Sequence, residues 1–502
     1  MKALQAKVES AIILNMLTDV FPKLQAAKVV MGIRAFFRSP WYIAATTLLM
    51  VFSVLFGLEL LCYWLLLGFG IVAALFDEDM LAVAPLAVCG YMSVSAKNNI
   101  GKHVEPTAFA DPRFQLQLAF IAIVAAIVLL ARLVSLLLQN RRRGVPRLTL
   151  GFAALGLAYL LGGAFSGGML RSSLFGLVQI ACLAGLYFYL YFTVDWTRVR
   201  TDYCAMLLTI VGMGLCVQIA SMYFSETILG ASSIDRGDLY LGWGIHNNVG
   251  CMMAMLLPAP FYFAIKRKHG WAFTLLGSAF LLFVALTQSR GAILFGAVVY
   301  VACAVFVLAT TKGRERIYHL VVFLALVLAG VISFLIFRER LAKLFASVIS
   351  SGFNDSLRFD TYRSCWARFL EYPLFGAGFY NTPGTLLIDG SMHTVDGAFG
   401  DAFLPPRAHN TVFQLLASGG IFAILCYGFH RAETLISLFR KPSVEKTIIF
   451  FSMLALLLTS LLDCHFFNFG PGLVYGILLV FAEGIDKRKH GDAPPYWLRK
   501  KQ

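Results

Sequence analysis

The sequence predicts an all-α polytopic membrane protein, and three observations lead to this fold class. First, 59% of the 502 residues are hydrophobic and 14% are charged, whereas soluble domains have about 45–50% apolar and about 25% charged residues. Second, the mean hydropathy is +0.76. Third, apolar runs of about 20 residues, long enough to cross a bilayer, recur along nearly the whole chain. These runs must be helical, because lipid cannot satisfy open backbone groups.

About 14 transmembrane helices are expected, within a range of 12–14 because the first three segments are short. The expected helices lie at about 43–57, 60–76, 80–95, 117–138, 148–167, 172–192, 203–223, 248–265, 270–287, 291–309, 319–337, 411–430, 447–462 and 468–484.

The distribution of Lys and Arg predicts which side of the membrane each connection faces. With the N-terminus inside, the inner connections carry 28 of the 42 Lys and Arg residues, as the positive-inside rule requires. The clusters Arg141–Arg143 and Lys266–Lys268 then both lie inside. We therefore expect a protein of the cytoplasmic (inner) membrane, with both termini in the cytoplasm.

This topology divides the chain into five parts. They are a cytoplasmic or interfacial N-terminal segment at 1–40, transmembrane helices 1–11 at 41–337, a large extracytoplasmic loop at 338–410, transmembrane helices 12–14 at 411–484, and a basic cytoplasmic tail at 485–502.

The long outer loop contains one predicted helix. Phe359, Tyr362, Trp366 and Phe369 recur at helical spacing, which is typical of an amphipathic helix. Pro373 should end this helix, because proline removes a backbone donor and clashes with the preceding turn. We expect the helix to lie on the membrane surface.

Charge and cysteine usage exclude several functions. The net charge of +15 comes from basic residues in short loops between apolar runs, so no stripe for nucleic acid is formed. The ten cysteines include no Cys-x-x-Cys pair, which argues against a zinc site and a disulfide framework. His393, Asp396 and Asp401 are too scattered for metal ligands. We expect neither a metal nor another cofactor.

Polar residues gather at the outer ends of four even-numbered helices. Helix N-termini carry partial positive charge and free N–H groups, so several of them at one depth favour a phosphate or diphosphate. The residues at these ends are His246, Asn247, Asn248, Arg290, His409, Asn410, Asp463 and His465.

Each of these residues also has a purely structural interpretation. Arg290 could anchor its helix at the membrane interface. His246 could cap or pack, and Asp463 and His465 could pair only with each other. The three asparagines could be ordinary N-caps; they are Asn247, Asn248 and Asn410.

Four motifs lie between about 240 and 430: "LRFDTYRSCWARFLEYPLFGAGFYN" and "PPRAHNTVFQLLASGG", with "LTQSRGAILFG" and "HNNVGCMMAMLLP" upstream. Together they resemble the membrane domain of bacterial O-antigen ligases and the related surface-polysaccharide polymerases. The family pattern is an Arg, an aromatic residue four positions later, Pro-Leu-Phe-Gly-x-Gly, and a His-Asn pair before a helix. Two positions depart from it: Tyr362 stands where Trp is more usual, although Trp366 follows one turn later, and Asn247 stands where Pro is commoner.

The resemblance implies a metal-independent membrane glycosyltransferase of the GT-C type. Such an enzyme moves a glycan from a polyprenyl diphosphate, such as undecaprenyl diphosphate, to an acceptor hydroxyl with inversion. Arg290 and Arg358 are then expected to stabilise the departing diphosphate, and His409 to be the catalytic base. The other site residues would bind substrate: His246, Asn247, Asn248, Tyr362, Trp366, Asn410, Asp463 and His465.

Several functions remain open at this point. A ligase and a polymerase share the donor and differ in the acceptor, which is a core lipid or protein for one and another lipid-linked glycan for the other. The product would be a lipopolysaccharide, or a capsule or wall glycan. A flippase for the same lipid should place charges along several spans, whereas here the polar groups lie at the outer ends. A peptidoglycan polymerase would lack the His-Asn pair after a long loop.

Overall fold

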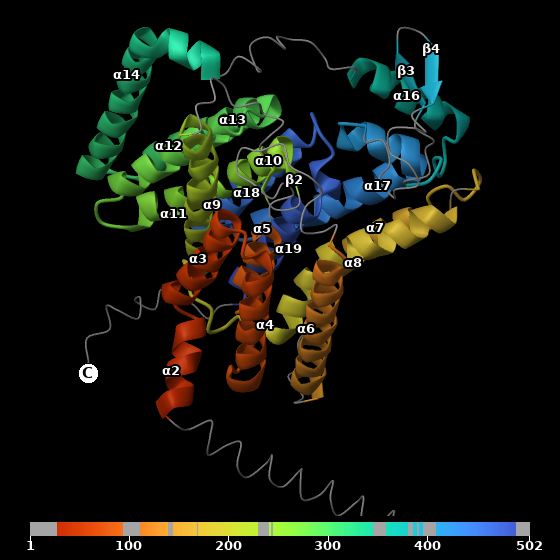
Figure 1. Ribbon diagram of the computed structural model, residues 1–502, viewed down its shortest axis with the longest axis horizontal. Helices are drawn as coiled ribbons and strands as arrows, with labels where there is room; N and C mark the ends of the chain where they lie inside the picture. The colour runs from red at the N-terminus through yellow and green to blue at the C-terminus, as the bar shows by residue number, and fades with distance from the viewer. Residues whose placement is uncertain are drawn as a thin grey trace, which may run out of the picture.

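The computed structural model describes residues 28–93, 111–138, 144–167, 169–228, 240–241, 244–344, 358–379, 385–388, 391–394 and 408–487. These form a bundle of helices with two small hairpins (Figure 1). The helices and strands are α2 (Lys28–Phe37), α3 (Pro40–Phe56), α4 (Glu59–Phe76), α5 (Val83–Met92), α6 (Pro112–Leu138), α7 (Thr149–Leu161), α8 (Met169–Thr193), α9 (Tyr203–Ile228), β1 (Tyr240–Leu241), β2 (Gly244–Ile245), α10 (His246–Leu256), α11 (Ala259–Lys266), α12 (Trp271–Leu286), α13 (Arg290–Thr310), α14 (Gly313–Leu344), α16 (Arg358–Glu371), β3 (Thr385–Ile388), β4 (Ser391–Thr394), α17 (Thr411–Phe439), α18 (Val444–Thr459), η3 (His465–Phe467) and α19 (Phe469–Ile485).

The molecule is a polytopic membrane protein. Among the described residues, eight helices are long and apolar enough to cross a membrane, or nine if α2 and α3 form one bent span. Four other expected segments correspond to shorter apolar helices, which are α5, α7, α12 and α19. Fourteen crossings therefore stay a prediction. Residues 1–27 and 488–502, from the predicted N-terminal segment and basic tail, lie outside the described residues.

The centre of the bundle is formed by α10, α11, α18 and α19. The span His246–Lys266 is 94% buried within the protein, because α10 packs against α12, α13, α18 and α19. Pro258 separates α10 from α11, since proline cannot continue the helical hydrogen-bond ladder. The start of α10, which carries Asn247 and Asn248, is therefore held by protein on several sides.

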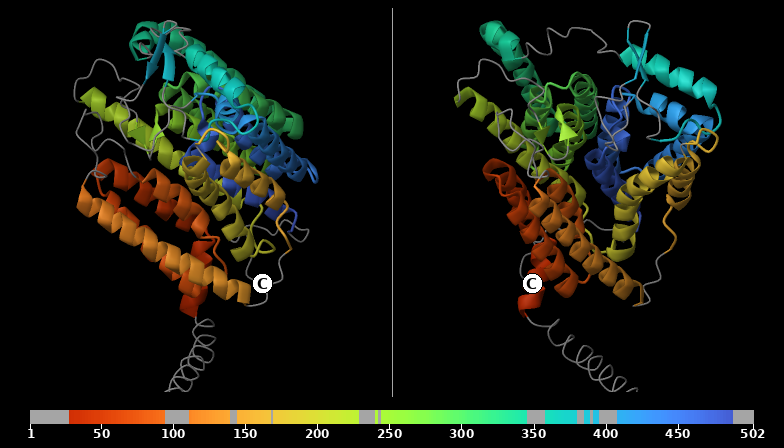
Figure 2. Two further views of the ribbon diagram at one scale, coloured as in Figure 1. Left: turned by 90° about the vertical axis from the view of Figure 1, so that its right-hand side faces the viewer. Right: turned by 45° about the vertical axis from the view of Figure 1, so that its right-hand side comes forward.

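Two groups of helices flank this centre (Figure 2). On one side, α2–α6 lie together, and α3 packs against α9. In the other group, α7 and α8 pack against each other, α7 also contacts α17, and α8 contacts α19 as well as α6 of the first group. The long helix α14 stands at the edge of the bundle. None of the residues in its most apolar stretch is buried inside the protein, which suits a helix that faces lipid.

The end of α17 differs from the sequence-based prediction. The helix was expected to end at 430, but it continues to Phe439, so the predicted boundary is wrong. Arg431 consequently lies within the helix rather than in an inner connection. Its guanidinium carbon is 4.6–4.8 Å from the ring centroids of Tyr427, Phe466 and Tyr475. These cation–π contacts explain how an apolar span accommodates the charge.

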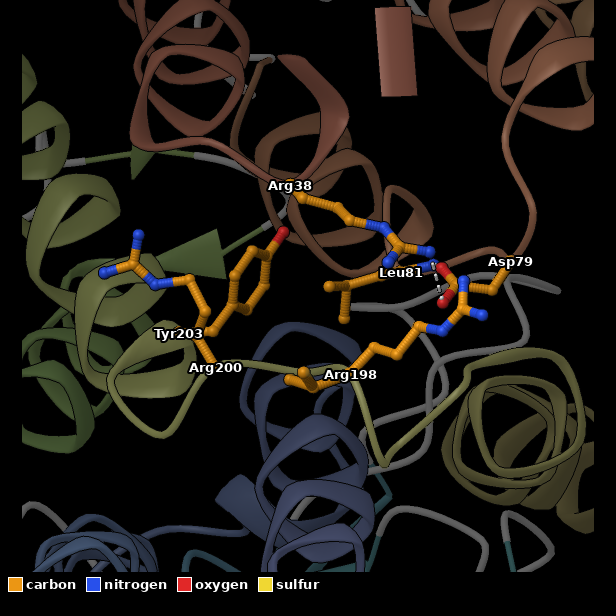
Figure 3. Close-up of a pocket in the computed structure, with 7 residues that line it drawn as sticks. Arg38, Asp79, Leu81, Arg198, Arg200 and Tyr203 are labelled. Atoms are coloured by element: carbon orange, nitrogen blue, oxygen red, sulfur yellow. Dashed lines mark hydrogen bonds and ion pairs between the residues drawn. The ribbon is translucent and has the colours of Figure 1, made fainter. Parts of the chain in front are cut away.

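Predicted inner connections meet at one end of the bundle through ion pairs. Arg38 lies 3.0 Å from Asp79, and Arg200 and Arg267 both pair with Asp202, at 2.7 and 3.0 Å. Figure 3 shows the small pocket that Arg38, Asp79, Arg198, Arg200 and Tyr203 line there. Its arginines already have carboxylate partners, so this pocket is an anchoring network.

Candidate active site

The candidate site is built around the Asp463 carboxylate, between α18 and η3. Asn247 Nδ2 donates to Asp463 Oδ2 at 3.0 Å, and the Cys464 backbone N–H donates to Oδ1 at 2.7 Å. His409 Nδ1 lies 3.4 Å from Oδ1. The starts of α10 and α17, which are far apart in the sequence, therefore meet beside one carboxylate. The prediction that these helix ends bind a diphosphate stays a prediction.

Asp463 is held in its charged form. Its side chain is buried, and burial alone would raise the pKa of the carboxyl group. The nearby His465 and His409 and the Cys464 N–H oppose burial and hold the pKa well below its usual range. The Asp463 carboxylate is therefore ionised at neutral pH beside His409.

His409 occupies an unusual backbone conformation. Its φ is 51°, a left-handed value that costs a non-glycine residue roughly 1–3 kcal/mol. Tyr362 fixes it by donating its hydroxyl to the His409 carbonyl at 3.2 Å and by stacking on Phe413, with ring centroids 4.7 Å apart. The His409 side chain is 42% exposed. The imidazole is thus supported on its Nδ1 side and remains accessible to a substrate.

Asn410 is the N-cap of α17. Its side-chain oxygen accepts hydrogen bonds from the N–H groups of Val412 and Phe413 at 2.8 and 3.2 Å, and its Nδ2 donates to the Leu461 carbonyl at 2.9 Å. The structural interpretation of this asparagine is therefore confirmed. Asn410 also ties the start of α17 to the segment that carries Asp463.

Asn247 and Asn248 take different partners. Asn247 bridges Ser289 and Asp463, because its Oδ1 accepts from Ser289 Oγ at 2.9 Å while its Nδ2 donates to the carboxylate. Asn248 lies 3.3 Å from His465 Nδ1 and accepts from Asn468 Nδ2. Both asparagines thus link the start of α10 to the Asp463–Asn468 segment.

The three histidines of the site, His246, His409 and His465, differ in exposure. His465 is only 2% exposed, and its Nδ1 contacts Asn248 and Asn468. It therefore holds these two asparagines in place. His409 is accessible. His246 begins α10 and is half-buried. The proposal that Asp463 and His465 pair only with each other is wrong, because each has other partners.

The two predicted diphosphate-binding arginines, Arg290 and Arg358, each begin a helix. Arg290 follows Ser289, which caps α13 by accepting from the Ala292 N–H, and neighbouring Gly291 packs against Leu462. Arg358 begins α16. Burial raises the pKa of Tyr362, and the Arg358 charge opposes this rise, which places Arg358 within electrostatic reach of the Tyr362 hydroxyl.

Trp366 takes a different position from its helical neighbour Tyr362. The helix α16 is confirmed and ends before Pro373, as predicted. Trp366 packs against Phe369 with ring centroids 5.1 Å apart and is 47% exposed. It therefore presents an aromatic face to the surroundings, outside the hydrogen-bonded cluster at Asp463.

Three supporting residues were not among the predicted site residues. Ser289 bonds Asn247, and Asn468 bonds Asn248. Gln414 holds the chain just before His409, because its Oε1 accepts from the Ala408 N–H at 2.9 Å while its Nε2 donates to Ser418. Ser289 and Asn468 each precede a helix, a signal that could have identified them, whereas Gln414 gives no such signal.

Residues 252–428 match the protein-family model described as O-antigen ligase. This region of the chain is therefore similar to the O-antigen ligase domain. No curated protein matches the chain. The matched region of the O-antigen ligase domain contains Arg290, Arg358 and His409. Asn247 and Asp463, which contact each other, lie outside it.

Proposed function

We propose that this protein is an inverting membrane glycosyltransferase. It moves a glycan from a polyprenyl-diphosphate carrier to an acceptor hydroxyl at the outer face of the membrane. The observation that carries the proposal is the accessible His409 imidazole beside the charged Asp463 carboxylate, within a domain of the O-antigen ligase family.

His409 is the base in this mechanism. The acceptor hydroxyl transfers its proton to His409, and the acceptor oxygen attacks the anomeric carbon of the donor glycan. The bond from that carbon to the diphosphate breaks, and the carrier diphosphate leaves with the electron pair. Asp463 lies beside Nδ1 of His409, which leaves Nε2 for the hydroxyl and stabilises the imidazolium that forms.

Arg290 and Arg358 supply the positive charge for the leaving group. A departing diphosphate accumulates negative charge, and guanidinium groups can bind its oxygens with two hydrogen bonds each. The N-termini of α13 and α16, where these arginines lie, add partial positive charge. We propose that this arrangement removes the need for a metal ion.

The acceptor decides between two forms of the reaction. We favour a ligase, whose acceptor is a lipid or protein glycan, because the matching family model is described as O-antigen ligase. A polymerase that joins lipid-linked repeat units of a surface polysaccharide or capsule is the alternative. Both use the same donor chemistry.

A reconstituted assay tests whether the protein is an enzyme or a carrier. The purified protein in liposomes receives a polyprenyl-diphosphate-linked oligosaccharide and a lipid-glycan acceptor. We expect a new glycosidic product and release of polyprenyl diphosphate in equal amounts, with activity retained in EDTA. Movement of the donor across the bilayer without bond formation would establish a flippase instead.

Cysteine labelling tests the proposed orientation. On a cysteine-free background, single cysteines at Lys268 and Thr385 report the predicted inner and outer faces. A membrane-impermeant maleimide added to intact cells should modify position 385 and leave position 268 unmodified. The reverse pattern would contradict an outward-facing site.

A further inference from the structure

The helix α17 is broken at Gly420, whose φ of 62° and ψ of −158° are not helical. Such a break leaves four backbone groups without helical partners. The N–H groups of Ile421 and Phe422 lose the carbonyls four residues earlier, which belong to Ala417 and Ser418. Within a membrane protein such groups must find other partners.

A distant segment satisfies all four groups. The N–H groups of Ile421 and Phe422 donate to the carbonyls of Pro373 and Leu374, at 2.9 and 3.2 Å. The carbonyls of Ala417 and Ser418 accept from the N–H groups of Ala377 and Gly378, at 2.8 and 2.9 Å. The segment 373–379, called the clamp below, therefore replaces the two helical hydrogen bonds that the break removes.

Two glycines allow this close approach. A Cβ on Gly420 would lie 2.5 Å from the Leu374 carbonyl carbon, and a Cβ on Gly376 would lie 2.6 Å from the Ser418 oxygen. Both glycines also have positive φ, at 62° and 63°, which side chains with a Cβ rarely adopt. In contrast, a Cβ on Gly428, farther along the same helix, would meet nothing within 4 Å.

The clamp is fixed from two other sides. Toward α7 and α8, the Phe375 carbonyl accepts from the Gly163 N–H at 2.8 Å, and Ser166 Oγ donates to the Ala377 carbonyl at 2.7 Å. Toward α16, the Gly376 N–H donates to the Tyr372 carbonyl at 2.9 Å. The clamp thus follows α16, which carries Arg358, and is hydrogen-bonded to α17, which follows His409.

We propose that the clamp is a positioning element, which holds the outer half of α17 at a fixed angle and so sets His409 relative to Arg358. The outer half, Thr411–Gly419, is held at both ends. Near His409, Phe413 stacks on Tyr362 of α16, and at the break the backbone is hydrogen-bonded to the clamp. This role rests on the proposed glycosyl transfer, in which base and leaving-group stabiliser must act on one substrate.

Alanine at the two tight glycines tests the proposal, with Gly428→Ala as the matched control. Gly376→Ala and Gly420→Ala should lower kcat for glycan transfer roughly a hundredfold, as misplacement by about 1 Å can, while the KM for the donor changes much less. Gly428→Ala should transfer normally. If Gly376→Ala and Gly420→Ala kept the kcat of the unsubstituted protein, as Gly428→Ala should, the proposal would be overturned.

Cross-linking provides a readout that does not depend on glycan transfer. Cysteines replace Tyr362 and Phe413 as the test pair, and Phe439 and Phe450, whose rings are 5.1 Å apart at the other end of α17, as the reference pair. The glycine variants should form the test cross-link at least tenfold more slowly and the reference cross-link at the normal rate. An unchanged test cross-link would refute the clamp even if the protein proved not to be a transferase.

Ser166→Ala provides a milder variant if the glycine substitutions disturb folding and slow both cross-links. It removes one hydrogen bond to the clamp without introducing a clash. A severalfold fall in both kcat and the test cross-link rate would support positioning, and no change in either would refute it.

Discussion

Two carboxylates at different ends of the molecule are buried and yet shifted in opposite directions. Asp463, at the proposed outer face, has a pKa held well below its usual range by His465, His409 and the Cys464 N–H against the effect of burial. Asp77, at the predicted inner face, has a pKa raised to about 7 by burial and by neighbouring Asp79. Burial is common to both, so the neighbours decide the direction.

The comparison distinguishes a site in which one carboxylate stays ionised from a network in which several carboxylates and arginines pair with one another. Around Asp463 the contacts come from an amide, a backbone N–H and imidazole rings, which stabilise the anion without neutralising it. Around Asp77 and Asp79, arginine and carboxylate charges alternate. The first arrangement suits support of a base, and the second suits fixation of helices α2 and α4 to the bundle.

The largest expected effect is loss of the base at the outer cluster. His409→Ala should lower single-turnover glycan transfer by about 10²–10⁴-fold, the usual contribution of general base catalysis. His269→Ala is the matched control, since His269 also has a positive φ, of 62°, and is exposed outside the outer cluster. Full activity of His409→Ala together with loss in His246→Ala would reassign the base.

The arginines should show the next largest effect. Arg290→Lys and Arg358→Lys should each lower transfer roughly a hundredfold, because lysine keeps the charge but lacks the planar, two-pronged donor geometry. Arg368→Lys on the same helix as Arg358 is the control, as Arg368 pairs with Glu371. Near-normal transfer by Arg290→Lys and Arg290→Ala would mean that Arg290 only anchors α13.

Neutralising the two clusters should separate catalysis from anchoring. Asp463→Asn keeps the shape but removes the charge beside His409, and transfer should fall roughly ten- to hundredfold. Asp79→Asn at the inner cluster should leave the rate per folded molecule unchanged. Equal losses of kcat in both variants, measured at matched folded protein, would show that Asp463 has no special relation to His409.

The smallest effect concerns stability and pH. Asp77 binds its proton more tightly in the folded protein than in the unfolded chain, so stability should fall as pH rises from about 4 to about 7 and level off above that. Asp77→Asn should remove this slope and raise stability at pH 8 by about 1–2 kcal/mol. The control is Asp111→Asn at an exposed helix start. Thermal unfolding of both variants in detergent between pH 5 and 8 measures how stability changes with pH. If stability fell with rising pH in Asp77→Asn as it does in the unsubstituted protein, the Asp77 carboxyl group would not be its cause.

The sequence predicted features that are local along the chain. Helix α16 and its end before Pro373 follow from the spacing of Tyr362 and Trp366. The common depth of the helix starts in the membrane stays a prediction. Features that depend on contacts through space were not predictable. Asn248 meets Asn468 across 220 positions, and the hydropathy of α17 gives no sign that a distant loop closes its break.

The burial of the cysteines has a consequence for redox chemistry. On the proposed topology, Cys365 in α16 and Cys464 beside the carboxylate face a compartment in which thiols are readily oxidised. Cys464 is 1% exposed, and burial raises the pKa of the Cys365 thiol to about 12. Since oxidation and disulfide exchange proceed through the thiolate, both thiols should remain reduced, and the site should work without reductant or protective disulfides.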